Sequence, residues 1–117
     1  MTERVVIVEG VRTPIGRFGG TLKNVSSGFL AAHVITALLN KTGVHPEQVE
    51  EVILGEVRQT TESSNVARVA TIRAKLPVEV PAFTINRLCA SGMQAIASGV
   101  QQIQSGHAQI VIAGGTE

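Results

Sequence analysis

Four short apolar runs, rich in valine, isoleucine and leucine, are separated along the chain by polar or glycine-containing segments, and such runs predict buried strands. The predicted strands are residues 5–8, 52–55, 80–86 and 110–113. Between them, apolar positions recur every three or four residues, which predicts helices. The predicted helices are residues 28–41, 66–75 and 90–105. Strands and helices therefore alternate in the order βαβαβαβ.

Residues that flank the helices support these boundaries. Ser26 or Ser27 can cap the first helix, and Gly43 stands where a left-handed C-terminal cap belongs. Residues 45–47 predict a short helical turn, and Asn65 is interpreted as the N-cap of the second helix. The third helix is expected to bury one apolar stripe against the sheet. That stripe consists of Met93, Ile96, Ala97, Val100 and Ile103.

Strands that alternate with helices are typical of a mostly parallel sheet with right-handed crossovers. The composition agrees, because 44% of the residues are hydrophobic while only three are phenylalanine and none is tyrosine or tryptophan. An aliphatic, β-branched core suits parallel strands that are covered on both faces. We therefore expect an α/β fold in which helices cover a mostly parallel sheet.

The distribution of charge argues against two classes of partner. The net charge is +1 and the lysines and arginines are scattered singly, so no basic surface for nucleic acid is expected. The apolar runs are far shorter than the roughly 20 residues that span a bilayer, and the first residues do not have the pattern of a secretory signal. We expect a cytoplasmic protein without nucleic-acid or membrane partners.

The chemically distinctive residue is Cys89, the one cysteine of the chain, which has no partner for an internal disulfide. It lies between a predicted strand and a helix that begins at once. Unpaired amides and the dipole at a helix N-terminus favour the reactive thiolate, and an amide there could stabilise a developing oxyanion. The small residues 90–92 leave room for an acyl group. Position alone leaves two readings open, a buried inert thiol or a nucleophile.

Three sequence blocks bear on this choice. TINRLCASGMQAI at residues 84–96 closely resembles the nucleophile segment of thiolases. VRTPIGRFGGTL at residues 11–22 is similar to that family's loop after its opening strand, and VIAGGTE at residues 111–117 is similar to a family strand that leads into a Gly-Gly turn. The blocks occur in the family's order, so the resemblance covers the whole chain. It implies the N-terminal half of a thiolase, either an acetyl-CoA acetyltransferase or a 3-ketoacyl-CoA thiolase.

The resemblance implies a role for Cys89 as the nucleophile that attacks an acyl-CoA thioester and holds the acyl group as an enzyme thioester. In that family, the acyl group then passes to the carbanion of acetyl-CoA. The reverse reaction is thiolysis, and both directions belong to fatty acid metabolism. Acetyl-CoA or acyl-CoA would be a substrate, with no covalently bound cofactor and no metal. Thiolases also imply a homodimer or homotetramer.

The same resemblance implies what residues 1–117 do not contain. They would form the N-terminal part of the thiolase N-terminal domain, without the CoA-binding loop region, the C-terminal domain, the catalytic histidine or the second cysteine. The chain alone is then expected to be inactive. Its three histidines match no catalytic block and are interpreted as structural or surface residues. They are His33, His45 and His107.

One segment departs from the family. Residues 59–65 replace a turn that often contains glycine and glutamine, so the loop and nearby subunit contacts are expected to differ. The pairs Gly19-Gly20 and Gly114-Gly115 are interpreted as turns rather than phosphate loops, because neither has the required motif. Arg12 and Arg87 are interpreted as structural or solvated charges.

Two alternatives remain open. A ketoacyl-synthase-like condensing enzyme shares the fold but pairs its cysteine with two histidines. A noncatalytic thiolase-like subunit would act as a dimerising scaffold and would carry an inert Cys89.

Overall fold

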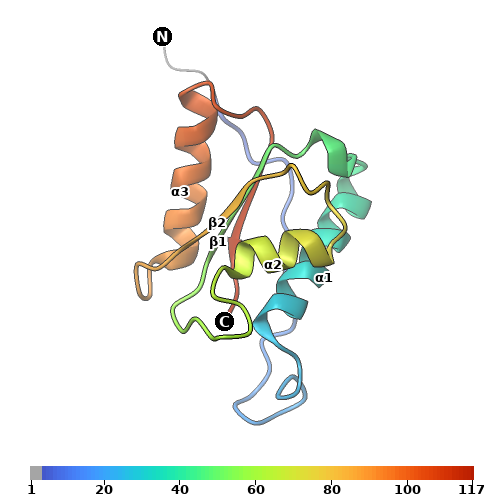
Figure 1. Cartoon of the computed structure of the whole chain (residues 1–117), viewed down its shortest axis with the longest axis vertical. Helices are drawn as coiled ribbons and strands as arrows, with labels where there is room; N and C mark the ends of the chain where they lie inside the picture. Colours follow the sequence, from blue (N-terminus) through green and yellow to red (C-terminus); the bar gives the residue numbers. More distant parts are fainter. Residues whose placement is uncertain (1–3) are drawn as a thin grey trace.

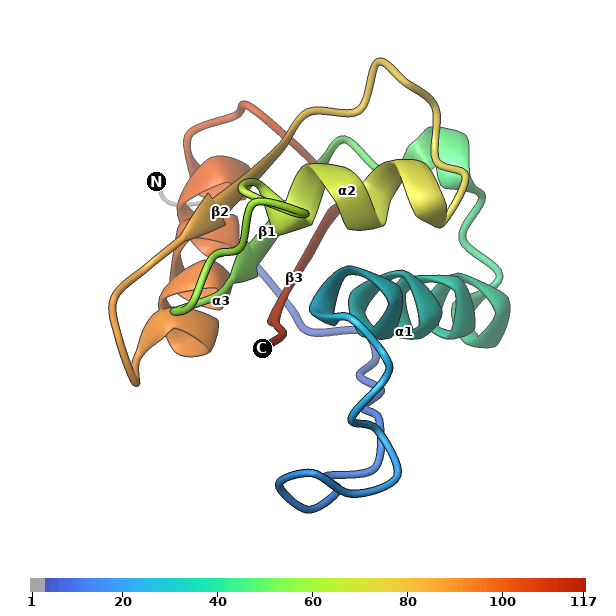
Figure 2. The ribbon, with the colours of Figure 1, turned by 60° about the horizontal axis from the view of Figure 1, so that its bottom comes forward.

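The computed structural model of the protein describes residues 4–117. The elements in this part of the chain are α1 (Ser27–Thr42), the 3-10 helix η1 (Pro46–Gln48), β1 (Glu51–Gly55), α2 (Val66–Arg73), β2 (Ala82–Ile85), α3 (Ser91–Gln104) and β3 (Val111–Gly115). They form three layers, with α1 and α2 packed together on one face of a sheet and α3 on the other (Figures 1 and 2). Within the described residues, no helix is long and apolar enough to span a bilayer.

The sheet is parallel throughout and has the order β2-β1-β3. In the central strand, Ile53 lies opposite Phe83 on one side and Ala113 on the other, and every residue of β1 is buried. Burial on both faces explains why this strand reads as a continuous apolar run. The expected α/β fold with a parallel sheet is confirmed.

The hydrophobic core lies mainly between the sheet and the helices α1 and α2. Its buried members include residues from both helices and from the sheet: Ala31, Ile35, Leu39, Val52, Leu54, Val66, Ala67, Ala70 and Ile112. The predicted caps are confirmed, since the Ser26 hydroxyl accepts a hydrogen bond from the Phe29 amide and Gly43 has a φ of 73°. Local signals therefore placed α1 correctly.

The predicted strand at residues 5–8 is not formed. Residues 4–17 have no helix or strand, and the side chains of Val6, Ile7 and Val8 are 67%, 80% and 79% exposed. A β-branched run forms a strand when neighbouring side chains and a sheet edge cover it, and here the side chains lack that cover. An ion pair between Glu9 and Lys41, with 3.4 Å between Nζ and Oε1, joins the segment to α1 instead.

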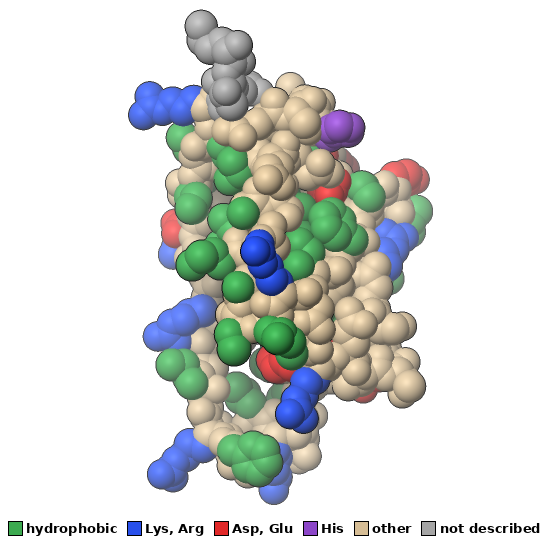
Figure 3. All heavy atoms as spheres, turned by 90° about the vertical axis from the view of Figure 1, so that its left-hand side faces the viewer, with side chains coloured by type: hydrophobic (Ala, Val, Ile, Leu, Met, Phe, Trp, Pro, Cys, Tyr) green, Lys and Arg blue, Asp and Glu red, His purple; other side chains and the backbone are tan. Residues whose placement is uncertain are grey.

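The predicted buried stripe of α3 is also wrong. Met93 and Ile96 are 78% and 42% exposed, whereas Ser91, Ala95 and Gly99 are buried. Small residues let the helix approach the sheet closely: a Cβ added to Gly99 would lie 3.3 Å from a methyl group of Val111. The larger apolar side chains remain on the outer side of the molecule, where Figure 3 shows hydrophobic side chains along the face formed by α3.

Candidate active site

Cys89 lies at the carboxyl edge of the sheet, between the end of β2 and the start of α3. Its thiol is free and the residue is exposed. The reading of Cys89 as a buried core thiol is therefore wrong, and the sulfur is accessible to a reagent or substrate. Ligands in α/β folds bind at this edge of the sheet, so the location suits a reactive group.

The turn that carries Cys89 has an unusual backbone conformation. Leu88 has a φ of 49°, in the left-handed region that costs a residue with a side chain roughly 1–2 kcal/mol. The Leu88 amide donates to Oδ1 of Asn86 at 3.0 Å, and the Ser91 hydroxyl donates to the Leu88 carbonyl at 2.6 Å. The same hydroxyl accepts a hydrogen bond from the Arg87 amide at 2.8 Å. Hydrogen bonds from both sides thus hold the strained residue that precedes Cys89.

The helix after Cys89 begins without a capping side chain, because its N-cap residue is Ala90. The first amides of a helix have no intrahelical partner, and together with the dipole they attract negative charge. Cys89 lies two residues before the first residue of α3. The prediction that Cys89 lies beside a helix N-terminus in the chain is confirmed.

Two glycines bring this helix terminus directly onto the sheet. A Cβ added to Gly55, the last residue of β1, would lie 2.5 Å from the carbonyl carbon of Ser91 and 2.7 Å from the nitrogen of Gly92. A Cβ added to Gly115 would lie 3.4 Å from the Cα of Gly92. Gly114 and Gly115 belong to β3, so their assignment to a turn is wrong; close packing explains the glycine at position 115. Gly19, with a φ of 68°, does lie in a turn.

Side chains beyond the strand ends join the three strands to the Cys89 turn. The Asn86 amide group donates to the Val57 carbonyl at 3.0 Å, while its oxygen accepts the Leu88 amide. The Glu117 carboxylate accepts hydrogen bonds from the Val57 and Arg58 amides at 2.9 and 2.8 Å. Sequence reasoning did not assign a role to Asn86 or Glu117. The available signal was their position at the carboxyl edge, since Asn86 directly follows β2 and Glu117 lies two residues after the end of β3.

Glu56 is a buried carboxylic acid at the same edge, and sequence reasoning missed it as well. Its side chain is 1% exposed, and among the described residues its Oε1 has no hydrogen-bond partner. Burial raises the pKa of Glu56, and the charge of Glu117 raises it further, while the Ser27 side chain acts in the opposite direction. A buried carboxyl group without a cationic partner favours its neutral form.

The three histidines and Arg12 lie outside this arrangement, and Arg87 takes part in it through its backbone amide. His33, His45 and His107 are exposed, as expected for surface residues. Arg12 donates to the Thr13 carbonyl and Arg87 to the side chain of Gln94. Within residues 4–117, no group of three or more histidine, cysteine or acidic side chains could hold a metal ion.

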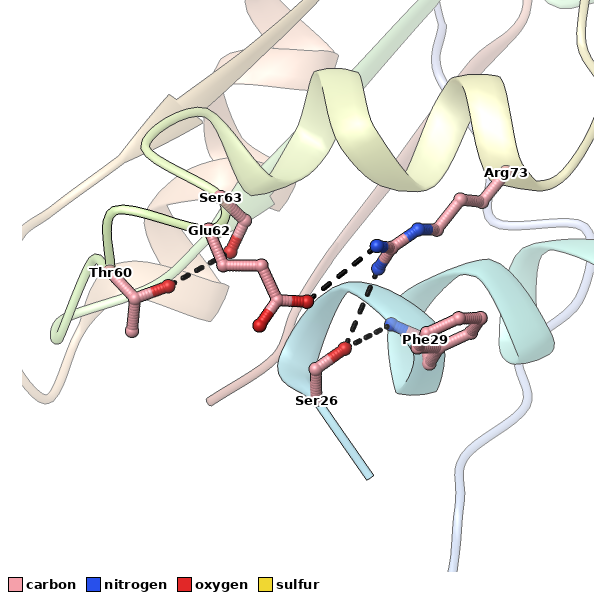
Figure 4. A network of polar contacts seen from close by, with 6 residues as sticks. All are labelled: Ser26, Phe29, Thr60, Glu62, Ser63 and Arg73. Atoms are coloured by element: carbon pink, nitrogen blue, oxygen red, sulfur yellow. Dashed lines mark hydrogen bonds and ion pairs between the residues drawn. The ribbon is translucent and has the colours of Figure 1, made fainter. Parts of the chain in front are cut away.

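The loop that departs from the family pattern is tied to two helices (Figure 4). Arg73 of α2 contacts the Glu62 carboxylate at 3.6 Å and lies over the ring of Phe29 of α1, 4.1 Å from its centroid. One of its nitrogens is also 3.5 Å from the Ser26 hydroxyl. These contacts set the position of the loop beside both helices.

Asn65, at the end of this loop, caps α2 as predicted. Its Oδ1 accepts hydrogen bonds from the Arg68 amide at 3.2 Å and the Thr84 hydroxyl at 2.7 Å. Its Nδ2 donates to the Ala82 carbonyl at 3.1 Å. The cap therefore also joins α2 to β2, the strand that leads to Cys89.

The chain is similar to known proteins along its whole length. The family described as "Thiolase, N-terminal domain" matches residues 5–117. The acetyl-CoA acetyltransferase of Syntrophomonas wolfei is 49% identical over 117 residues, which are 100% of this chain and 30% of that protein. The acetyl-CoA acetyltransferase of Cupriavidus necator is 49% identical over 113 residues, 97% of this chain and 29% of that protein.

A solved structure agrees with these relatives. The crystal structure of the Bacillus anthracis acetyl-CoA acetyltransferase matches with a TM-score of 0.87 and 50% sequence identity, over 90% of this chain and 27% of that one. The chain thus spans about 30% of the length of the curated relatives it matches. The family match, these relatives and the shared fold together show that the chain belongs to the thiolase family.

Proposed function

We propose that this chain provides the nucleophile of an acyl-CoA acyltransferase, and that Cys89 is the nucleophile. The Cys89 thiolate attacks the carbonyl carbon of an acyl-CoA thioester and forms a new carbon–sulfur bond. The bond to the CoA sulfur breaks, and CoA leaves as a thiolate that takes up a proton. The observation that carries the proposal is the exposed thiol on a strained turn at the N-terminus of α3. The first amides of a helix have no intrahelical partner, so they can donate hydrogen bonds to the developing oxyanion.

The similarity to the relatives named above, which are acetyl-CoA acetyltransferases, supports acetyl-CoA as the substrate. In the complete reaction, the acetyl group passes from Cys89 to the carbanion of a second acetyl-CoA and gives acetoacetyl-CoA. Thiolysis of a 3-ketoacyl-CoA is the same reaction in reverse. CoA thioesters are substrates here, with no resident cofactor.

The second half-reaction needs an acid or base and a bound CoA. We assign both to parts of the relatives that this chain does not span, namely the catalytic histidine, the second cysteine and the CoA-binding region. Removing a positioned acid or base typically costs roughly 10²- to 10⁴-fold in rate. Residues 1–117 alone are therefore expected to accept an acyl group slowly and not to turn over.

We also propose that the protein acts as a homodimer or homotetramer. Exposed apolar side chains on α3 and at residues 6–8 support self-association, because large apolar patches often mark interfaces. Sedimentation equilibrium tests this point, and a monomer at every accessible concentration would reject it.

The nucleophile is tested by incubating the purified chain with acetyl-CoA and analysing it by mass spectrometry. We expect one acetyl group on the peptide that contains Cys89, released by neutral hydroxylamine as a thioester should be. The Cys89→Ala variant serves as the control and should remain unmodified. An unmodified wild-type chain that is folded would favour the alternative of a noncatalytic scaffold.

A further inference from the structure

Glu56 is positioned where the end of β1, the end of β3 and the start of α1 meet. Its carboxyl group is buried, and this burial raises its pKa. The Ser27 side chain of α1 lowers that pKa and the Glu117 carboxylate beyond β3 raises it. The same two elements are joined nearby, because the Thr116 hydroxyl donates to the Ser27 carbonyl at 2.9 Å. Neither ion pair within the described residues, Lys41–Glu9 or Arg73–Glu62, involves Glu56.

The backbone around Glu56 supports the Cys89 turn directly. Gly55 lies against the backbone of Ser91 at the start of α3. The Glu56 amide donates to the Ile85 carbonyl at 3.1 Å, at the end of the strand that leads to the turn. The Val57 carbonyl accepts a hydrogen bond from Asn86, which in turn accepts the Leu88 amide. Each residue of the segment 55–57 therefore contacts a part of the structure that orients Cys89.

We propose that Glu56 is a positioning residue whose buried carboxyl group fixes the segment 55–57 and, through Asn86, the turn that carries Cys89. The role deepens the proposed function, since it matters only if Cys89 reacts. Glu56 acts through the backbone and does not touch the acyl group.

The geometry makes this role dependent on the protonation state of Glu56. The neutral carboxyl group can remain buried beside Glu117. When it ionises, a second negative charge is placed next to the carboxylate that holds the Val57 and Arg58 amides. Repulsion between the two carboxylates, together with the cost of burying a charged group away from water, then loosens the segment 55–57. Because burial raises the pKa of Glu56, the loosening is expected as the pH rises above the ordinary carboxyl range.

The test compares Glu56→Gln, which keeps the size and stays neutral, with Glu56→Ala, which leaves a cavity. The control is Glu51→Gln, at the opposite end of β1, where a buried carboxylate accepts hydrogen bonds from Gln102. Two rates are measured between pH 4.5 and 8 on folded protein: alkylation of Cys89 by iodoacetamide and hydrogen exchange of the Leu88 amide. In alkylation, the thiolate sulfur displaces iodide.

We expect the wild-type alkylation rate, divided by that of Glu56→Gln at the same pH, to fall as the pH rises. Over the same range, the exchange rate of the Leu88 amide in the wild type, divided by that in Glu56→Gln, should rise. Glu56→Ala should change the alkylation rate by at least about threefold at every pH from 4.5 to 8. Glu51→Gln should change neither the alkylation rate of Cys89 nor the exchange rate of the Leu88 amide. Ratios of wild-type to Glu56→Gln rates that do not change with pH would overturn the proposal. The comparison of these two proteins is sufficient even if Glu56→Ala does not fold. Because iodoacetamide reacts with any accessible thiol, this result is independent of whether acetyl-CoA acetylates Cys89.

Discussion

The close contact between Gly55 and α3 gives a sharp test of how Cys89, the proposed nucleophile, is placed. In Gly55→Ala, the new Cβ would lie 2.5 Å from a backbone atom of Ser91 and 2.7 Å from one of Gly92. Carbon atoms in contact prefer a separation of about 3.5–4.0 Å, so the helix terminus must move by roughly 1 Å. No side-chain rotation can relieve the clash, because both obstructing atoms belong to the backbone.

Forcing atoms into a packed site costs typically 1–3 kcal/mol, and the upper end is expected here. Replacing glycine also restricts the unfolded chain, which stabilises by about 0.4–1 kcal/mol. The free energy of unfolding should therefore fall by about 2 kcal/mol. A shift of about 1 Å can lower a reaction rate by as much as 10²-fold, so acetylation of Cys89 should slow by at least about tenfold.

Gly114→Ala is the matched control. Gly114 lies opposite Leu54 in the neighbouring strand, and its added Cβ would meet only a Leu54 methyl group at 3.9 Å, an ordinary contact. This variant should keep or slightly raise the free energy of unfolding, measured by urea denaturation followed by circular dichroism, and should be acetylated at the wild-type rate. Equal stability and equal acetylation rates of the two variants would show that the contact at Gly55 does not position the start of α3.

Three further predictions concern residues around the site. Asn65→Ala should lower the free energy of unfolding in urea by about 1–2 kcal/mol, because it removes the α2 cap and leaves Thr84 without its acceptor, whereas Asn65→Asp should keep most of the cap. Leu88→Gly should raise the stability by up to about 1 kcal/mol in thermal unfolding, since glycine adopts a φ of 49° without strain, and a loss would contradict this. The wild type should lose stability relative to Glu56→Gln as the pH rises from about 4.5 through the raised pKa of Glu56, because the folded state binds that proton more tightly; urea denaturation at several pH values checks the sign.

Sequence reasoning located the elements whose signals are local. Ser26, Gly43 and Asn65 mark helix ends through their own backbone and side-chain preferences, so α1 and α2 could be predicted. The segment at residues 5–8 was predicted wrongly because a strand also requires a neighbour, which the sequence pattern does not reveal. The face of α3 was predicted wrongly because hydrophobic periodicity gives most weight to large side chains.

The candidate site could be predicted only in part. Cys89 could be singled out as the one cysteine of the chain, between a predicted strand and a predicted helix, but its proposed role came from the resemblance to thiolases. Asn86, Glu56 and Glu117 are single polar residues with no periodic pattern, and they come together only when three parallel strands end at one edge. Their roles follow from tertiary contacts across 29 and 60 positions of the chain, which no local window contains.

The small residues on the inner face of α3 have a consequence for how this helix tolerates variation. Ala95 and Gly99 lie where a larger side chain would push the helix away from the sheet, whereas Met93 protrudes into open surroundings. If every residue of α3 were replaced in turn and only folding were scored, Met93 should tolerate many replacements, whereas Ala95 and Gly99 should tolerate few. The usual link between residue size and intolerance to mutation would be inverted along this helix.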